Sequence, residues 1–580
     1  MTPPTRERAS RLLLPLGGFA LVTVAFYWGG IRHFGTRIMS AGGDGSTFLW
    51  AFWAMPRAAL RLENPFVTDQ LFHPVGADLA FHASTPSAIV LSWPVARLFG
   101  VGIAMNVLQV AAALLSALGA YFLALRVCGD RRAAFFAGVA FAFVPYRFVH
   151  GAAGHFNLIH AQLLPFGLLA LLRLLERPSR GRAAALGAVV GLTFLTDVYY
   201  TVFLLVGMAV LLAARRREVP TAVLGKLAGA AGVAALVALP LAVPMAQALR
   251  AGELDPLPGW GGADARSADL VSWFLPWQAH PLWGSVVDDA RRRLSAGAEG
   301  IVYPGLVVLT LAVAGREFGD RARRRGWVAL AVTAGVLALG PFLQIGGRSG
   351  AGFSYLGREF AVPLPYLALH LVPVLNGVRV PGRFGILAIL ALAVLAASTL
   401  AAVARRWPAR GGWAIAAATA VLVVELLPGP MPSHPVDAPA PYRAIAADAD
   451  PGAVLEIPLQ WQSGVVVVGD PAPPRDFSIF LYYATVHGKP LVSGHVSRYP
   501  DERLERLTRV PVYRQVLALA GEPGFDDPPT FDAGDLRALG IGFVVYHRDP
   551  PLPAVLEHLE GLGLEVLADD GGIVVWKVNR

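Results

Sequence analysis

The sequence contains almost no cysteine and little charge. Its 580 residues include 1 Cys, and charged residues make up 15% of the chain. The single Cys128 excludes an internal disulfide framework and any metal site built on cysteines. Hydrophobic residues make up 55%, and the mean hydropathy is +0.53. A chain this apolar is not an ordinary soluble protein, so we predict a polytopic α-helical membrane protein.

The sequence also lacks the short motifs of several enzyme classes. It contains no P-loop, no dinucleotide-binding fingerprint, no His-Glu-x-x-His zinc motif and no nucleophile elbow. We therefore expect no ATP-driven chemistry within this chain. The formal net charge of +9 could indicate nucleic-acid binding. Its arginines, however, form short clusters between apolar runs, as in membrane proteins, so we expect no nucleic-acid partner.

About eleven apolar runs are candidates to cross a bilayer. The first, from about Leu12 to Gly30, is longer than the core of a signal peptide, and we expect it to be retained. The others lie near Val101–Val127, Ala133–Val149, Leu158–Leu175, Ala183–Leu195, Tyr199–Ala213, Leu224–Ala246, Ile301–Val313, Trp327–Ile345, Phe384–Val403 and Trp413–Leu427.

Basic clusters fall on alternate connections between these runs, which predicts a cytoplasmic N-terminus in the plasma membrane. If Ser87–Gly100 were counted as a full span, every later basic cluster would lie on the opposite side of the membrane from the first. We therefore interpret it as a half-inserted or interfacial helix. The basic clusters are Arg6–Arg11, Arg126–Arg132, Arg173–Arg182, Arg215–Lys226, Arg316–Arg325 and Arg405–Arg410.

Composition changes after Leu427, which predicts two domains: a transmembrane domain over 1–430 and an extracytoplasmic α/β domain over 431–580. The first outer loop, 31–100, contains an amphipathic stretch, Trp50–Leu62, that reads as an interfacial helix able to seat a lipid-linked substrate. In the second domain, the pattern predicts strands at Val454–Pro458, Ile541–Tyr546 and Gly572–Val578, and a helix at Ala554–Gly561.

A lone carboxylate, Asp44, follows the first apolar run within the stretch Ser40–Trp50. Glycines at 43 and 45 permit a tight turn and a close approach by another molecule. A carboxylate at the mouth of a membrane cavity is a candidate catalytic base or metal ligand. The alternative is a solvated loop aspartate after a span.

Histidines gather at a Gly-rich tip that contains His150, His155 and His160. A five-residue spacing does not place histidines on one helix face, so the sequence predicts no helical metal clamp. We select His155 as a candidate for substrate or metal contact, with a polar loop cap as the alternative. Four residues of the first loop could also ligate a divalent cation together with Asp44: Asp69, His73, Asp78 and His82. Apart from this possible cation, we predict no cofactor with certainty.

Asp197 lies between two apolar stretches that are too close together for a long loop. An ionisable residue at membrane depth is a candidate functional residue. Tyr199 and Tyr200 follow it and could stack on a sugar or bond its hydroxyls. The alternative is a helix N-cap aspartate beside interfacial aromatic residues.

Arg379 and Arg383 lie on the side of the membrane where the positive-inside rule predicts few basic residues. Guanidinium groups there would suit a lipid phosphate, because arginine bonds phosphate oxygens in pairs. The alternative is that both arginines cap carbonyls or meet lipid headgroups. Glu299 precedes a span, where it either contributes to the site or balances a helix dipole.

Together these features resemble the GT-C superfamily of membrane glycosyltransferases. The resemblance is carried by an acid just after the first span, interfacial helices in the first outer loop, about eleven spans and an outer C-terminal domain. Three segments, Ala298–Gly305, Asn376–Arg383 and Tyr482–Gly494, are similar to segments of bacterial membrane proteins grouped with that superfamily.

The resemblance implies transfer of a sugar from a polyprenyl-phosphate-linked donor to a glycan, lipid or protein acceptor of the cell envelope. Asp44 would be the general base on the acceptor hydroxyl, and a single displacement would invert the anomeric centre. Many relatives have paired acids where this chain has only Asp44, so the resemblance does not fix metal dependence. Two other functions remain open: a transporter or flippase for a lipid-linked precursor, and a non-catalytic envelope assembly protein.

Overall fold

The computed structural model describes residues 5–579 except 42, 218, 220, 256–258, 295, 316–320, 350–352, 356–357, 373–374, 436, 465, 470–477 and 527–529. The chain divides into two compact units, and we describe each by itself. The helical unit comprises Met1–Phe34, Asn106–Leu239 and Leu257–Pro432. The mixed unit comprises Gly35–Met105, Pro240–Pro256 and Ser433–Arg580.

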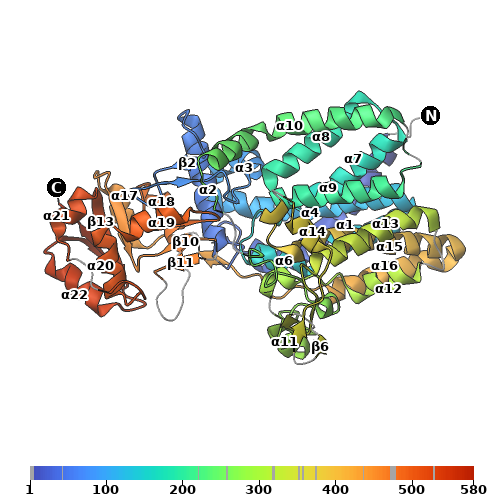
Figure 1. The fold of residues 1–580 in the computed structure, drawn as a ribbon. Helices are drawn as coiled ribbons and strands as arrows, with labels where there is room; N and C mark the ends of the chain where they lie inside the picture. The colour runs from blue at the N-terminus through green and yellow to red at the C-terminus, as the bar shows by residue number, and fades with distance from the viewer. Residues whose placement is uncertain are drawn as a thin grey trace. The chain divides into compact units, whose positions relative to one another are not determined.

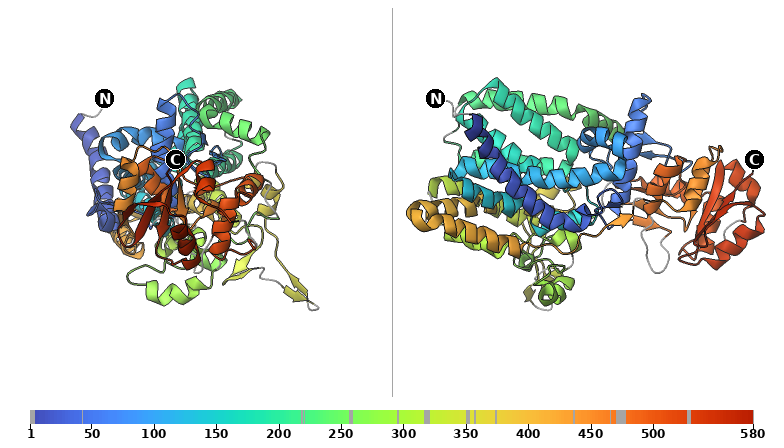
Figure 2. Two further views of the ribbon diagram at one scale, coloured as in Figure 1. Left: turned by 90° about the vertical axis from the view of Figure 1, so that its left-hand side faces the viewer. Right: turned by 180° about the vertical axis from the view of Figure 1, so that it is seen from behind.

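The helical unit is a bundle whose long helices run side by side, as Figures 1 and 2 show. A helix overlaps each of the predicted apolar runs. The long helices are α1 (Thr5–Ile31), α4 (Val101–Cys128), α5 (Arg131–Ala142), α6 (Pro145–Ala152), α7 (Leu163–Glu176), α8 (Arg180–Thr196), α9 (Val198–Ala214), α10 (Thr221–Arg250), α12 (Leu306–Ala314), α13 (Arg321–Ala338), α15 (Gly385–Arg406) and α16 (Pro408–Glu425).

Short elements connect these helices. They are η1 (Leu270–Trp273), α11 (Gly284–Arg292), η2 (Gly297–Gly300), β4 (Gln344–Ile345), β5 (Arg348–Ser349), β6 (Phe353–Tyr355), β7 (Arg358–Phe360), α14 (Tyr366–His370), η3 (Leu375–Gly377) and η4 (Pro381–Phe384).

Among the described residues, five helical segments are long and apolar enough to cross a membrane. The chain is therefore a multi-pass membrane protein, while the predicted number of eleven spans stays a prediction. Several helices are shorter than their apolar runs because proline or glycine interrupts them. Pro145 separates α5 from α6, and α12 begins only after Pro304-Gly305. The five segments are Leu13–Ile31, Val101–Cys128, Arg131–Ala152, Thr221–Arg250 and Pro381–Arg406.

Helix α15 lies at the centre of the bundle, with α5, α12, α13 and α16 packed around it. Small residues allow other helices to approach closely. A Cβ atom added at Gly187 on α8 would lie 2.3 Å from the carbonyl oxygen of Ala230 on α10. Only glycine fits at this crossing, as is common where helices pack in membranes.

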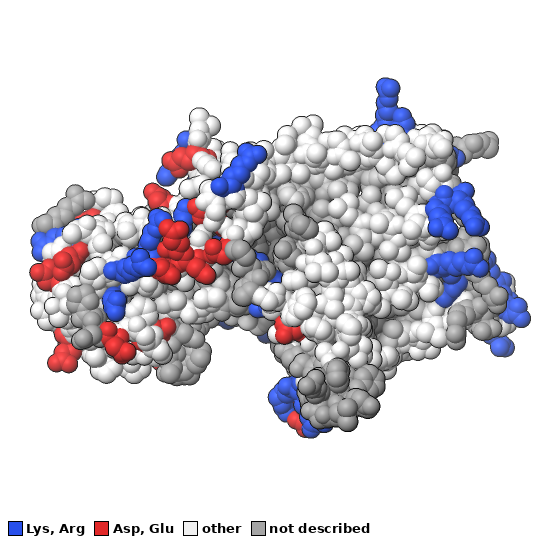
Figure 3. All heavy atoms as spheres, in the orientation of Figure 1, with Lys and Arg blue, Asp and Glu red and all other residues white. Residues whose placement is uncertain are grey.

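Basic residues gather at one end of the helical unit, and the flank of the bundle carries few charges (Figure 3). Contacts join several of these helix ends. Arg126 Nε at the end of α4 donates to Glu176 Oε1 of α7 at 2.7 Å, and Arg405 Nη1 of α15 donates to the Cys128 carbonyl at 3.4 Å. This grouping agrees with the predicted topology, although residues 316–320 of one cluster lie outside the described residues. The cytoplasmic assignment of this end stays a prediction.

The mixed unit contains the first loop together with the C-terminal residues. Helices α2 (Asp44–Leu60) and α3 (Pro86–Phe99) come from the loop, and α2 packs against α18 (Ile479–His487). The largest sheet has the strand order β14-β15-β13-β9. Strand β9 (Ala453–Ile457) pairs with β13 (Ile541–His547) in parallel. Strand β15 (Ile573–Lys577) is antiparallel to β13, and β14 (Glu565–Asp569) is antiparallel to β15.

The remaining elements of the mixed unit are short. They are β1 (Arg37–Ile38), β2 (Val67–Thr68), β3 (Ala77–Asp78), β8 (His434–Pro435), α17 (Ala440–Ala447), β10 (Trp461–Ser463), β11 (Val466–Val468), β12 (Gly494–Val496), α19 (Asp501–Thr508), α20 (Pro511–Leu519), α21 (Ala533–Ala538) and α22 (Pro553–Gly561).

Two features of the mixed unit differ from the sequence interpretation. We assigned the first loop to the domain 1–430, whereas it belongs to the same compact unit as Ser433–Arg580. Helix α2 begins at Asp44 rather than near Trp50, because Gly43 takes a positive φ of 58° and starts the helix earlier. The predicted strands and the helix at Ala554–Gly561 are present in the C-terminal residues.

Candidate functional site

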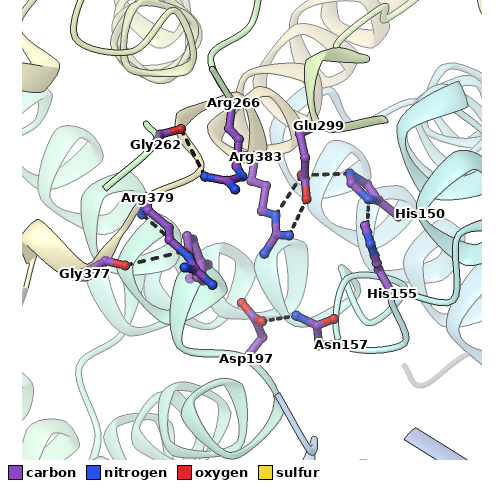
Figure 4. A network of polar contacts seen from close by, with 11 residues as sticks. His150, His155, Asn157, Asp197, Gly262, Arg266, Glu299, Gly377, Arg379 and Arg383 are labelled. Atoms are coloured by element: carbon purple, nitrogen blue, oxygen red, sulfur yellow. Dashed lines mark hydrogen bonds and ion pairs between the residues drawn. The ribbon is translucent and has the colours of Figure 1, made fainter. Parts of the chain in front are cut away.

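A polar network crosses the helical unit where α6, α9, η2 and η4 meet (Figure 4). It begins at the histidine-rich tip. Helix α6 ends at Ala152, and Gly154, with a φ of 80°, turns the chain so that His155 N donates to the His150 carbonyl at 2.9 Å. The two Nδ1 atoms then lie 2.8 Å apart. The two histidines therefore meet through a helix end and not along one helix face.

Glu299 of η2 and Arg383 of η4 form the charged centre of this network. Arg383 Nε donates to Glu299 Oε2 at 2.9 Å, and Arg383 Nη2 makes a second contact with Oε1. Both side chains are only 14% exposed. A Cβ atom added at Gly382 would lie 2.2 Å from the Glu299 carbonyl oxygen, so glycine permits this close approach of the two segments. A two-point pair of this kind is among the stronger polar contacts.

The ion pair controls the charge of Glu299. Burial by itself would raise the pKa of Glu299, but Arg383 and the nearby His150 outweigh it and hold the pKa well below its ordinary value. Glu299 is therefore ionised at neutral pH. His150 Nε2 lies 3.6 Å from Glu299 Oε2 and has no hydrogen-bond partner among the described residues.

Arg379 and Arg266 add two further positive charges beside Arg383. Figure 4 shows the three guanidinium groups gathered near the centre of the network. Arg266 Nη1 donates to the Gly262 carbonyl at 3.2 Å, and neither Arg266 nor Arg379 has an ion-pair partner among the described residues. Burial, and then the neighbouring arginines, lower the pKa of Arg379. This excess of positive charge is suited to an anion.

Tyr199 connects the arginines to α9. Its hydroxyl accepts from Arg379 N at 3.2 Å, and the Arg383 guanidinium carbon lies 5.0 Å from the centre of its ring. This stacking is a cation–π contact that fixes the plane of the guanidinium. Tyr200 is fully buried and donates to the Leu158 carbonyl at 2.5 Å. A substrate contact by Tyr200, as predicted, would require this hydroxyl to change partner.

Asp197 is the N-cap of α9, as the alternative interpretation expects. Its Oδ1 accepts from Tyr200 N at 2.8 Å. The same carboxylate has a second function in the network, because Oδ2 accepts from Asn157 Nδ2 at 2.7 Å. Asn157 belongs to the same tip as His155. The cap and the histidine tip are therefore held together by one carboxylate.

His150, His155 and Glu299 are the group of three potential metal ligands that the described residues offer, with ligand atoms within 4.8 Å of one another. Two imidazoles and a carboxylate suit zinc. Both oxygens of Glu299 already contact Arg383, so a cation bound here would share the carboxylate with that guanidinium. The residues predicted for a site with Asp44, which are Asp69, His73, Asp78 and His82, form no such group within the described ranges.

Asp44 lies in the mixed unit as the first residue of α2, not in a loop. Its carboxylate is 44% exposed, and its Oδ1 lies 3.8 Å from His495 Nε2 of β12. The C-terminal segment holds the residue before Asp44 in place, because Ser478 Oγ donates to the Gly43 carbonyl at 2.9 Å. A carboxylate this exposed is accessible to another molecule.

The structure thus brings together most of the predicted site residues of the helical unit. Glu299, Arg383, Arg379 and Tyr199 contact one another, and His155 joins them through His150. Sequence reasoning missed Arg266 and Asn157 as members of the network. Arg266 lies on the side predicted to be extracytoplasmic, so the argument applied to Arg379 would also have selected it. Asn157 carries no comparable signal.

The sequence model of one protein family matches most of the chain. The domain of unknown function DUF6311 matches residues 15–427, and no curated protein matches. Among solved structures, arabinofuranosyltransferase AftD from Mycobacteria, a mutant seen in two classes, is 16% identical with TM-scores of 0.57. The matches cover 99% and 97% of this chain, but only 42% and 41% of AftD.

A second solved structure matches over its whole length. ArnT from Cupriavidus metallidurans, bound to undecaprenyl phosphate, is 15% identical with a TM-score of 0.50, and the match covers 99% of both chains. At these identities the likeness concerns the fold. The chain therefore belongs to the DUF6311 family and has the fold of the GT-C membrane glycosyltransferases, as the sequence predicted.

Proposed function

We propose that this chain is a membrane glycosyltransferase that transfers a sugar from a polyprenyl-phosphate-linked donor to an extracytoplasmic acceptor. The observation that carries the proposal is the position of Arg379 and Arg266 beside the Glu299–Arg383 pair. Glu299 compensates one guanidinium and leaves the other two without an ion-pair partner among the described residues. Two such groups are suited to the phosphate of a lipid carrier.

The arginines would act on the leaving group. As the bond between the anomeric carbon and the lipid phosphate breaks, negative charge grows on the phosphate oxygen. Preorganised guanidinium groups stabilise that charge without having to reorient, which lowers the barrier. The Arg383 side chain is fixed by Glu299 and by the Tyr199 ring, so it is preorganised in this sense. We assign the negative charge of Glu299 to holding Arg383 in place.

Asp44 would act on the acceptor. Its carboxylate would accept the proton of the acceptor hydroxyl while the oxygen attacks the anomeric carbon, and the phosphate would leave from the opposite face. A single displacement of this kind inverts the anomeric centre. AftD is named as an arabinofuranosyltransferase, and ArnT is described with undecaprenyl phosphate bound. The shared fold supports a transferase over a transporter.

A binding measurement tests the anion site. The full-length protein in detergent would be titrated with undecaprenyl phosphate and followed by native mass spectrometry. We expect Arg379→Gln to weaken binding by about 10- to 100-fold, because a hydrogen bond to a charged group contributes about 1.5–3 kcal/mol. Arg177→Gln, at the basic end of the bundle, is the charge-matched control. Equal binding by wild type and Arg379→Gln would remove the support for the proposal.

A further inference from the structure

A groove of about 620 Å³ lies in the mixed unit between α2 and α3, outside the polar network described above. Its walls are apolar, with Phe52 and Trp53 from α2 and Trp93 from α3. It extends to residues 100–102, where α4 begins. Because α4 is one of the helices that can cross a membrane, this end of the groove meets the start of a span.

Positive charge gathers along this groove. Arg57 and Arg97 line it, and Arg61 is the C-cap residue directly after α2. The Arg57 guanidinium lies 4.3 Å from the centre of the Trp53 ring and donates to the Trp53 carbonyl at 2.9 Å. Within the described part of the chain, none of the three arginines takes part in an ion pair. The described chain therefore supplies no counter-charge to these exposed arginines, and they are open to an anion from another molecule.

Exposed apolar side chains surround the same helices. Leu91, Leu98 and Phe99 of α3 are 75%, 74% and 63% exposed, and Leu60 at the end of α2 is 68% exposed. Apolar residues in such number on one short helix mark a surface that contacts lipid. An anion that reaches the arginines from this side therefore carries a hydrocarbon chain.

We propose that this groove binds an anionic phospholipid of the bilayer. Its phosphate would lie at Arg57 and Arg97, and one acyl chain would follow Trp53 and Trp93. Its residues are different from those of the proposed anion site at Arg379 and Arg266. A lipid in this groove would also affect Asp44, because Asp44 is the first residue of α2 and Arg57 lies in the last turn of the same helix. A lipid bound at one end of α2 would set the position of the helix in the membrane surface.

Lipid retention measures this binding. The full-length protein would be exchanged into detergent with equal amounts of phosphatidylglycerol and phosphatidylcholine of the same acyl chains, and retained lipid counted by native mass spectrometry. We expect wild type to retain phosphatidylglycerol. The double variant Arg57→Gln/Arg97→Gln should lose about 30-fold in affinity, about fivefold for each arginine near a lipid phosphate. The double variant Arg506→Gln/Arg509→Gln, which removes two exposed arginines at the end of α19, is the charge-matched control and should bind like wild type.

A second measurement avoids any folding defect of the variants. Wild-type protein would be irradiated with phosphatidylglycerol that carries a benzophenone on its acyl chain, and the adduct mapped by peptide mass spectrometry. An adduct on α2 or α3 supports the proposal, and adducts only elsewhere overturn it. Equal retention by the double variant overturns it as well. Retention of undecaprenyl phosphate in place of phosphatidylglycerol, when the two are supplied in equal amounts, would also overturn it and would assign the groove to the sugar carrier.

Discussion

Arg383 and Glu299 lie 84 positions apart in the sequence and form a two-point ion pair inside the helical unit. The pair joins η2 to η4, and η4 also adjoins Arg266, because Gly382 N donates to the Arg266 carbonyl at 3.1 Å. Because both side chains are largely buried, the pair is not screened as a surface pair would be. The pair fixes the geometry on which the proposed anion site depends.

Removal of the carboxylate should destabilise the protein. We expect Glu299→Gln to lower the free energy of unfolding by about 3–5 kcal/mol, because Arg383 is left buried and without its counter-charge. Glu176→Gln is the matched control. It removes the exposed partner of Arg126 and should cost less than about 1 kcal/mol. Thermal melting in detergent measures both, and equal melting temperatures for the two variants would contradict the account.

The effect of Glu299 on stability should hardly depend on pH above about 5. A carboxylate whose folded pKa is depressed contributes stability that is present above its ordinary value of 4.5 and lost as pH falls through the folded pKa. The difference in melting temperature between wild type and Glu299→Gln should therefore be the same at pH 8 and pH 6. It should shrink only below about pH 4. A difference that vanishes between pH 8 and pH 6 would show that the carboxylate is not held ionised by Arg383.

Substitutions at Asp197 separate its capping function from a contact with substrate. Asp197→Ala should cost about 1–2 kcal/mol of stability, since the cap of α9 is lost. Asp130→Ala, which removes the cap of α5 at Arg132 N and Ala133 N, is the control and should cost about the same. Asp197→Ser keeps a capping oxygen but removes the charge. We predict that Asp197→Ser folds normally and loses sugar transfer, and normal transfer by this variant would reduce Asp197 to a cap.

His495 should support the proposed base. Its Nε2 lies 3.8 Å from Asp44 Oδ1, and the imidazole is almost fully buried, so it limits the positions of the carboxylate. We expect His495→Gln to lower kcat for transfer by roughly tenfold with little change in KM, because a misplaced base acts on the chemical step. His558→Gln, on α22, serves as the control. A rise in KM without a change in kcat would contradict a positioning function.

Much of the helical unit could be predicted from the sequence, because apolar runs and basic clusters are local patterns. The ends of the helices were less predictable. Pro145 splits one predicted span, and Gly43 starts α2 six residues before the amphipathic stretch begins. Both outcomes depend on backbone conformations that hydropathy does not record.

The candidate site shows the same division between local and long-range information. In the sequence, Arg379 and Arg383 stand out as basic residues on the outer side, and Glu299 as an acid before a span. Their pairing was not predicted, because no sequence period specifies which loops meet at the end of a bundle. The contact between His150 and His155 was missed for a related reason. A five-residue spacing excludes one helix face, but the helix ends between the two residues and the chain turns back.

The central claim is that Asp44 accepts the proton of the acceptor in a sugar transfer. Asp44→Asn keeps the shape of the side chain and removes its basicity, so transfer from native lipid-linked donors in membranes containing each protein tests it most directly. Equal expression, equal melting temperature and unchanged donor binding are the required controls. The account predicts that transfer falls by about 10²- to 10⁴-fold while donor binding is retained. Full transfer by Asp44→Asn would contradict it and return Asp44 to a solvated carboxylate at the start of α2.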